Sequence, residues 1–505
     1  MKILLLEHPR QVAGARCNDI ANTPLSSCLI TGYAAGMLAR QGHEIKIVEG
    51  YLERLSYSEI YREVKEFGPD MLGVHMVYHW ERDEGLFAFL GKIKAEGTAP
   101  FIAAYGFYPT FAFEEIMGHC RAVDAVVMGE PEYTLARLAE KPRPVVHLQE
   151  IPGLARRDES GATRVRRREP VANLDLLPPP VRTDAMLRLP EINIEGSRGC
   201  YGGCSFCYIN AFYARGRAGG RGVSRWRGRG PESIVAEIDE LTAALGQKDF
   251  YFVDPNFFGP GRQGQDRALR LASLLKERGV RFGIEARVND IHDATIAALV
   301  EAGLRHILIG LESGGDESLQ RLNKMTTVAQ NERALRILRR HGIEPNVGFI
   351  MFEPDSSLED IRMNFAFLER NNLLKDLPVT ANVLYHPQII LQGTRAYHKL
   401  REEGRLKLLA TTYEGTAGFA DSRVAALARI MSGITNCLFM RMDGIWSGKT
   451  QGPKEAPAVY ARLNQALIDC FTGTLHQLES GKQFSPAEMA ALVHEAEREI
   501  NTLSR

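Results

Sequence analysis

The sequence has no long apolar segment. None of its 505 residues belongs to an apolar stretch of 18, so the sequence predicts no membrane-spanning helix. The apolar run at residues 2–6 is too short for a signal peptide and is better interpreted as a first β-strand. We therefore expect a cytoplasmic protein with no membrane partner.

The sequence also has no excess of either charge, with 62 Lys and Arg against 62 Asp and Glu. This balance gives no electrostatic reason for binding nucleic acid or an anionic surface. Residues 215–229 contain six arginines and Trp226, a composition that would suit RNA, but no RNA-binding module accompanies them. We interpret this run as a solvated loop from which one or two arginines reach a cofactor or substrate. No nucleic-acid partner is predicted.

Cysteine is scarce, which excludes a disulfide framework. Five of the eight cysteines are scattered and are typical of small buried apolar residues. The other three, Cys200, Cys204 and Cys207, fall within eight residues in the segment GSRGCYGGCSFCYINAF. Such a cluster requires its own explanation.

The three clustered cysteines have the spacing CxxxCxxC, directly after a predicted strand. Thiolates hold Fe–S clusters, and three thiolates on a [4Fe–4S] cluster leave one iron open for a cofactor or substrate. Gly199, Gly202 and Gly203 allow the loop to wrap closely around such a cluster. Zinc is the alternative, but zinc prefers four ligands, often in CxxC pairs, and no second pair is present. The motif therefore predicts a [4Fe–4S] site.

Strand-like and helix-like patterns alternate in two parts of the chain, which predicts the α/β class. Residues 1–140 predict a Rossmann-like domain with a parallel sheet covered on both faces, and residues 191–400 predict a full or partial (β/α) barrel. Residues 141–190 predict a linker with a β-hairpin around Gly161, and residues 401–505 a helical region. The expected strands are 2–6, 45–48, 71–77, 101–104, 125–128, 191–195, 249–253, 282–286, 306–309 and 345–351, and the clearest helices are 25–41, 232–245, 265–278 and 485–504.

The cysteine spacing, its place after the first barrel strand and the aromatic residue before the last cysteine resemble the radical S-adenosylmethionine (SAM) superfamily. The segments FVDPNFF, IEARVND, LIGLESGGDESLQRLNK and VGFIMFEPDSSLED resemble later family segments in the same order, although FEPD replaces the usual Gly-Leu-Pro-Gly. The resemblance implies that SAM binds the open iron and is cleaved to methionine and a 5′-deoxyadenosyl radical, with an electron from a reductase, flavodoxin or ferredoxin. It assigns cofactor binding to Phe206, Tyr208, Asp254, Asn256, Glu285, Arg287, Gly310 and Glu312.

Residues 24–140 resemble the cobalamin-binding Rossmann-like domain that precedes some radical SAM barrels. The matching pieces include PLSSCLITGYAAGMLARQGHEIKIVEG and VDAVVMGEPEYTL. Two places depart from that family: Tyr105-Gly106 replaces a Gly-Gly pair, and the third strand ends in the bulky HMVYHW. These side chains either cap the cobalt or fill the corrin's space, and His75 or His79 is either a lower cobalt ligand or a core histidine. Cobalamin binding therefore stays open.

Two reactions are compatible with this resemblance. The one that we favour at this point is diol dehydration, as in the radical SAM dehydratases of aminoglycoside antibiotic biosynthesis, on a polar, aminosugar-like small molecule. This reaction needs a proton-transfer residue. The candidates near the barrel mouth are Glu195, Asp254, Glu353 and His386. The alternative reaction is that of a cobalamin-dependent radical SAM C-methyltransferase. A regulatory module that uses the cluster only as a sensor is disfavoured by the full barrel pattern.

Overall fold

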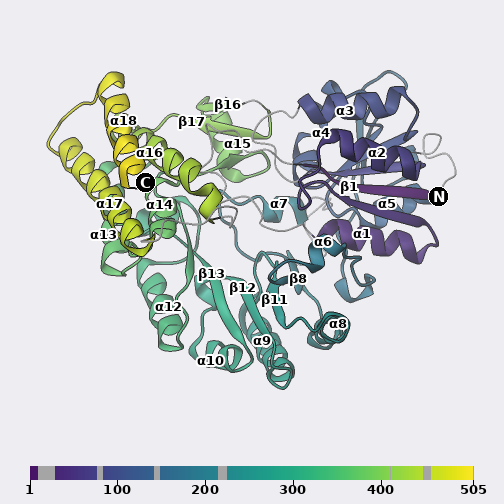
Figure 1. Ribbon diagram of the computed structural model, residues 1–505, viewed down its shortest axis with the longest axis horizontal. Helices are drawn as coiled ribbons and strands as arrows, with labels where there is room; N and C mark the ends of the chain where they lie inside the picture. Colours follow the sequence, from purple (N-terminus) through teal and green to yellow (C-terminus); the bar gives the residue numbers. More distant parts are fainter. Residues whose placement is uncertain are drawn as a thin grey trace.

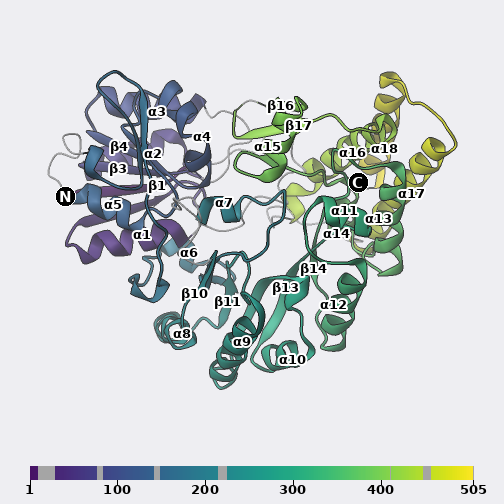
Figure 2. The same cartoon turned by 180° about the vertical axis from the view of Figure 1, so that it is seen from behind.

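The computed structural model describes residues 1–9, 29–76, 84–140, 148–213, 225–409, 411–446 and 456–503. The N-terminal α/β part and the second α/β part lie side by side, and the last three helices lie at the end of the molecule away from the N-terminus (Figure 1). Figure 2 shows the same arrangement from behind, with a short helix, α7 (Ile209–Tyr213), between the two parts. The α/β class is therefore confirmed.

The N-terminal sheet has seven strands in the order β2-β1-β3-β4-β5-β6-β7. Strands β1 to β5 are parallel, and outside the edge strand β2 their residues are almost all buried, as expected for a sheet covered on both faces. The strand order reverses between β1 and β3, and such a switch point is where ligands bind beyond the carboxyl ends of the strands. The elements are β1 (Lys2–Glu7), α1 (Leu29–Arg40), β2 (Glu44–Glu49), α2 (Tyr57–Phe67), β3 (Met71–His75), α3 (Glu84–Ala95), β4 (Phe101–Tyr105), α4 (Phe107–His119), β5 (Ala125–Val127) and α5 (Glu132–Ala139).

The predicted hairpin around Gly161 is confirmed. Strands β6 (Leu154–Arg157) and β7 (Thr163–Arg166) pair antiparallel, and Gly161 takes a left-handed φ of +81° in their turn. Because β6 also pairs antiparallel with β5, the hairpin extends the N-terminal sheet into the region predicted as linker. The division of the chain after residues 140, 190 and 400 stays a prediction.

The second sheet has five parallel strands in the order β14-β13-β12-β11-β8, which makes a partial barrel. Helices alternate with these strands and cover the outside of the sheet (Figure 1). The strands are β8 (Ile192–Ile194), β11 (Asp249–Phe252), β12 (Arg281–Arg287), β13 (Leu304–Glu312) and β14 (Asn346–Phe349), and the helices are α8 (Pro231–Leu245), α9 (Gly261–Lys276), α10 (Asp293–Glu301), α11 (Asp316–Arg321), α12 (Val328–Arg340), α13 (Leu358–Arg370) and α14 (Leu377–Tyr385).

The C-terminal region is helical only in part. A small antiparallel sheet, β15 (Ile390–Leu391), β17 (Glu414–Ala417) and β16 (Leu406–Leu408), precedes the final helices, and the predicted helical C-terminal region is confirmed. None of the described helices has the length and apolar character needed to span a membrane. The other elements are α6 (Asp184–Leu187), β9 (Ser197–Gly199), β10 (Trp226–Gly228), α15 (Arg395–Glu402), α16 (Ser422–Trp446), α17 (Ala456–Glu479) and α18 (Pro486–Leu503).

Candidate active site

The three clustered cysteines lie in the loop between β9 and α7. All three are free thiols and are half-buried. Strand β9 pairs antiparallel with β10, and a Cβ on Gly199 would collide with the backbone of Arg225, the residue before β10. Glycine, with a φ of +79° here, is therefore required where the chain leaves the ribbon and enters the cysteine loop.

Hydrogen-bond donors surround two of the thiols. Cys200 Sγ accepts from Gly202 N at 3.3 Å and from Asn256 Nδ2 at 3.7 Å, and Cys204 Sγ accepts from an Arg287 Nη at 3.2 Å. Donors of this kind stabilise thiolates. The described part of the chain contains no group of three His, Cys, Asp or Glu side chains placed around a single ion.

A cavity of about 210 Å³ opens beside the three cysteines. It lies inside the partial barrel, because residues of β12, β13 and β14 line it together with the cysteine loop. Five residues that the sequence assigned to cofactor binding are among its walls, and Tyr208, Asp254 and Asn256 are not among the described residues that line it. The lining is Cys200, Gly202, Cys204, Phe206, Cys207, Ile209, Asn210, Pro255, Glu285, Ala286, Arg287, Leu308, Gly310, Glu312, Lys324 and Gly348.

Glu285 is a carboxylate in the wall of this cavity that has a hydroxyl group as its hydrogen-bond partner. Tyr251 donates its hydroxyl to Glu285 Oε1 at 3.1 Å, and burial raises the pKa of Glu285 to about 7. Behind them, the Tyr251 ring stacks on His306, which is bonded to Glu191 at 2.7 Å. Glu285 is therefore suited to hold or release a proton near neutral pH.

Glu312, the other carboxylate in the cavity wall, is paired with a cation. Lys324 Nζ lies 2.7 Å from Glu312 Oε1, and both side chains are largely buried. Glu312 has a left-handed φ of +65°, an uncommon conformation for a residue other than glycine and typical of functional sites. Sequence reasoning missed Lys324, since its position in the quoted segment LIGLESGGDESLQRLNK gives no periodic relation to Glu312.

Asp254 and Asn256 lie one layer behind the cysteine loop. Asp254 accepts hydrogen bonds from Gly196 N at 2.6 Å and from the Ser197 hydroxyl at 2.9 Å, and burial raises its pKa to about 6. The backbone oxygen of Asn256 accepts from Trp226 Nε1 at 2.7 Å. These contacts fix the turn from β8 to β9 and the base of the cysteine loop. Asp254 therefore supports this loop from behind and does not line the cavity.

Glu195 is an ion-pair partner of a buried arginine. Arg198 is fully buried and lies 2.8 Å from Glu195, 2.8 Å from Glu130 and 2.6 Å from Glu132. Burial raises the pKa of Glu195 to about 7. Glu130 and Glu132 follow the N-terminal sheet, so this network joins the N-terminal part to the first barrel strand. The structure therefore does not support Glu195 as a proton-transfer residue.

Glu353 and His386 are also absent from the described cavity wall. Glu353 accepts from the Ser318 hydroxyl at 2.9 Å and from Arg321 Nε at 2.7 Å. The backbone oxygen of His386 accepts from Met351 N at 3.0 Å, which connects the end of α14 to the barrel. These contacts indicate a structural role for Glu353 and for His386. They do not favour the catalytic role that the sequence suggested for either residue.

Two of the six arginines in residues 215–229 form ion pairs that hold the fold together. Arg227 lies 3.0 Å from Glu130, and Arg229 lies 2.5 Å from Glu237 and 3.2 Å from the Tyr33 hydroxyl. Both arginines are buried, so the prediction of a solvated loop is wrong for them. Residues 215–224 of the predicted loop lie outside the described residues.

The switch point of the N-terminal sheet is filled by polar side chains. Glu7 at the end of β1 lies 2.7 Å from His75 Nδ1 at the end of β3, and Thr31 donates to Glu7. Tyr105 at the end of β4 stacks on His75 with ring centroids 5.1 Å apart, and its hydroxyl lies 2.9 Å from that of Thr31. All four side chains are buried. We define Glu7, Thr31, His75 and Tyr105 as the switch-point network; His79 lies outside the described residues.

Aromatic rings connect this domain to the cysteine loop. Phe107, at the start of α4, contacts Tyr208 at 5.0 Å and Phe212 at 4.2 Å between ring centroids, and Phe111 contacts Tyr208 at 6.3 Å. Tyr208 directly follows the last cysteine. Its described contacts are thus to the N-terminal domain, and a cofactor-binding role for Tyr208 stays a prediction.

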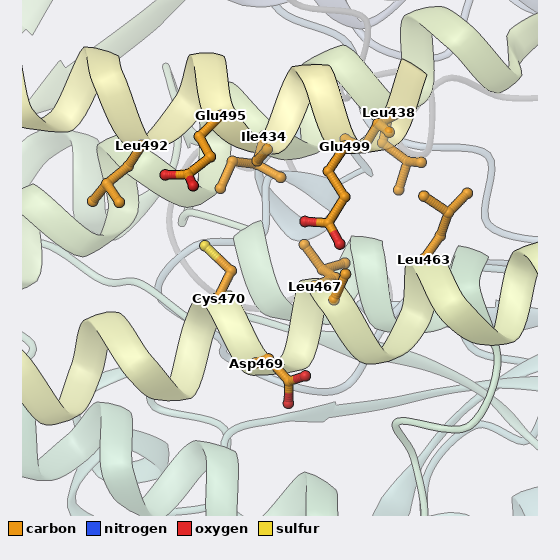
Figure 3. Close-up of a pocket in the computed structure, with 12 residues that line it drawn as sticks. Ile434, Leu438, Leu463, Leu467, Asp469, Cys470, Leu492, Glu495 and Glu499 are labelled. Carbon is orange, nitrogen blue, oxygen red and sulfur yellow. The ribbon is translucent and has the colours of Figure 1, made fainter. Parts of the chain in front are cut away.

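A second cavity, of about 270 Å³, lies among the three C-terminal helices. Figure 3 shows Glu495 and Glu499 on α18 pointing toward α17, from which Cys470 points into the gap. Aliphatic side chains such as Leu467 and Ile434 form most of its remaining wall. None of the clustered cysteines lines it, so this cavity is separate from the candidate active site.

A model of the Radical SAM superfamily matches residues 194–368. This match begins at the end of β8 and includes the three cysteines and the lining strands. The chain therefore contains a radical SAM domain. A domain of this kind uses a [4Fe–4S] cluster and SAM, and the three free thiols beside one cavity fit such a cluster.

Relatives and solved structures cover most of the chain. A protein of Pyrococcus horikoshii named an uncharacterized methyltransferase is 27% identical over 73% of this chain and 78% of its own. The 4′-phospho-dehydrooxetanocin synthase of Priestia megaterium is 26% identical over 63% of this chain and 45% of its own. The structure of OxsB, a cobalamin-dependent SAM radical enzyme with aqua-cobalamin and SAM bound, has a TM-score of 0.78 at 20% identity and covers 99% of this chain and 79% of its own. The last likeness shows that the whole fold is shared.

Proposed function

We propose that the protein is a radical SAM enzyme that removes hydrogen from a carbon of a polar small molecule and transfers a methyl group to that carbon. The observation that carries the proposal is the position of the three free thiols at one cavity inside the radical SAM domain. Methyl transfer is supported by the methyltransferase name of the Pyrococcus relative and by the full-length likeness to a cobalamin-dependent enzyme. Dehydration, which the sequence favoured, has no support from these relatives.

Different residues of the chain would have different roles in this reaction. Cys200, Cys204 and Cys207 hold the cluster, which when bound supplies the electron that cleaves SAM into methionine and a 5′-deoxyadenosyl radical. The cavity wall positions SAM between the cysteine loop and β12 to β14. Glu285 holds a proton beside it, because burial raises its pKa to about 7.

Cobalamin would supply the methyl group in such an enzyme, so the carboxyl ends of the N-terminal strands are where a corrin is expected. The buried switch-point network does not fit a cofactor that inserts between β1 and β3, because Glu7, His75 and Tyr105 already pack together there. A Cβ on Gly106 would also meet the His75 ring at 2.7 Å. Methyl transfer therefore requires the corrin to lie outside this network.

The same observation favours a second candidate, radical dehydration of a diol without cobalamin. In that reaction the chain needs a group that takes up and returns protons, and Glu285 meets this requirement from the cavity wall. The two candidate reactions differ in what they require of the N-terminal domain. Methyl transfer needs a bound corrin, and dehydration needs none.

Cobalamin binding separates the two candidates without knowledge of the substrate. Reconstituted protein is incubated with hydroxocobalamin and desalted, and the corrin is measured by its absorbance. About one corrin per chain, with S-adenosylhomocysteine formed beside 5′-deoxyadenosine, supports methyl transfer. No retained corrin in the wild type, but retention after Tyr105→Gly, refutes methyl transfer and supports the dehydratase. Tyr61→Gly, at a half-buried position of α2 outside the switch-point network, is the control for nonspecific loss of structure.

A further inference from the structure

Arg287 is held at the cluster loop by contacts on both terminal nitrogens. One Nη donates to Cys204 Sγ at 3.2 Å, and the other donates to the backbone oxygen of Lys324 at 2.6 Å. The guanidinium also lies over the Tyr201 ring at 5.4 Å, and Tyr201 donates its hydroxyl to Asp290 at 2.6 Å. The side chain is almost fully buried. Arg287 is therefore fixed in this orientation before any cofactor binds.

The residues around Arg287 leave space for this orientation. A Cβ on Gly202 would collide with the guanidinium, so the Cys-Tyr-Gly-Gly-Cys segment needs glycine at this position. The carbonyl of Lys324 is presented by a loop in which Asn323 and Met325 both have left-handed φ angles, of +48° and +59°. Asn323 Nδ2 also donates to the Gly203 oxygen at 2.5 Å, which attaches this loop to the cysteines.

In the described part of the chain, the guanidinium of Arg287 forms no ion pair with a carboxylate, and Asp290 acts on it only at longer range. Lys324, the other cation in the cavity wall, is paired with Glu312 at 2.7 Å. Among the described residues, Arg287 has no carboxylate within ion-pair distance, and its polar neighbours are a thiol and a carbonyl. A cation that donates to a cluster thiolate stabilises the reduced cluster, which carries one more negative charge, over the oxidised one.

We propose that Arg287 sets the reduction potential of the [4Fe–4S] cluster through its hydrogen bond to the Cys204 thiolate. This inference rests on the cluster of the radical SAM domain and not on the reaction proposed above. The electron taken up in the reduction comes from an external reductant, takes the cluster from the 2+ to the 1+ state, and breaks no bond. Cys204 and Lys324 take one N–H donor on each terminal nitrogen of Arg287.

The test is a redox titration of reconstituted protein without SAM, followed by the EPR signal of the reduced cluster. We expect Arg287→Gln to lower the ratio of reduced to oxidised cluster about tenfold at a fixed potential, a shift of about 59 mV for one electron. Arg287→Lys keeps the charge and should shift less. Arg281→Gln is the matched control, because Arg281 lies on the same strand in an exposed pair with Asp249 and should leave the potential unchanged.

SAM affinity, measured by equilibrium dialysis with labelled SAM, gives the second readout. A normal potential with lost SAM binding in Arg287→Gln overturns the proposal and returns Arg287 to the cofactor-binding role expected from the sequence. If Arg287→Gln does not retain iron, Gly202→Ala takes its place, since the added Cβ displaces the guanidinium and keeps its charge in the protein. A lowered potential in Gly202→Ala supports the proposal, and an unchanged one refutes it.

Discussion

Replacing Arg198 with methionine would remove a fully buried guanidinium while keeping most of the side-chain volume. Three carboxylates, those of Glu130, Glu132 and Glu195, lie within 2.8 Å of its nitrogens and would lose this partner. Removing one member of a buried ion pair costs about 3–5 kcal/mol, because the remaining charge stays buried without compensation. For a domain of 150–250 residues this corresponds to a fall in Tm of roughly 6–20 °C.

The pH dependence of this loss has a definite sign. Burial raises the pKa of Glu195 from 4.5 to about 7 in the folded protein, a shift equivalent to about 3 kcal/mol. A group with a raised folded-state pKa contributes stability that is present below pH 4.5 and is lost as the pH rises through 7. Without Arg198 the pKa of Glu195 should rise further. We therefore expect Arg198→Met to be less destabilising at pH 5 than at pH 8.

The assay is a thermal melt of wild type and variant at pH 5, 6, 7 and 8, followed by circular dichroism. Arg370→Met is the matched control, because Arg370 forms a partly exposed pair with Glu332 and should change stability by less than about 1 kcal/mol. Equal melting temperatures for wild type and Arg198→Met at pH 8 would refute the reasoning. So would a loss of stability that is independent of pH.

Three further outcomes follow from other parts of the molecule. Replacing Cys200, Cys204 and Cys207 together with alanine should reduce the iron content from about four per chain to none and abolish formation of 5′-deoxyadenosine, while the circular dichroism spectrum stays unchanged; a retained [4Fe–4S] spectrum would end the radical SAM interpretation of this loop. Glu285→Gln, which imitates the protonated acid, should remove any transition near pH 7 from the pH profile of SAM cleavage, since burial places the pKa of Glu285 there; a profile that keeps this transition would assign it to another group. Leu467→Ala, in the wall of the C-terminal cavity (Figure 3), should lower the free energy of unfolding by about 2–5 kcal/mol in a denaturant titration and leave SAM cleavage unchanged; a loss of SAM cleavage would connect this cavity to the active site.

The strands and the cysteine loop could be predicted from the sequence because their signals are local. Each expected strand overlaps an observed one, since a buried parallel strand is a short apolar run between turn residues. The thiols also needed only local information, because the three cysteines and the glycines that shape the loop fall within nine residues. The strands β16 and β17 were missed, and both lie in a segment of mixed polarity with no clear alternation.

The roles of charged residues could not be predicted in the same way, because they depend on partners far along the chain. Glu195 was expected to be catalytic from its place at a barrel strand end, yet Arg198 pairs it with a network that includes residues 130 and 132. The sequence alone does not show which residues form ion pairs. These ion pairs determine whether a carboxylate is free to react or is neutralised by a cation. The position of Tyr105, in contrast, could be interpreted from the sequence. Its side chain is much larger than the glycine usual at this position, which already indicated that it fills space at the end of its strand.

The position of Arg198 connects the two α/β parts to the cluster loop. Arg198 belongs to β9, two residues before Cys200, and it binds carboxylates that follow the N-terminal sheet. Gly199, between them, has no freedom to adjust, because the backbone of Arg225 packs against it. The ion pairs of Arg198 therefore connect the N-terminal domain to the strand that leads to the first of the three clustered cysteines.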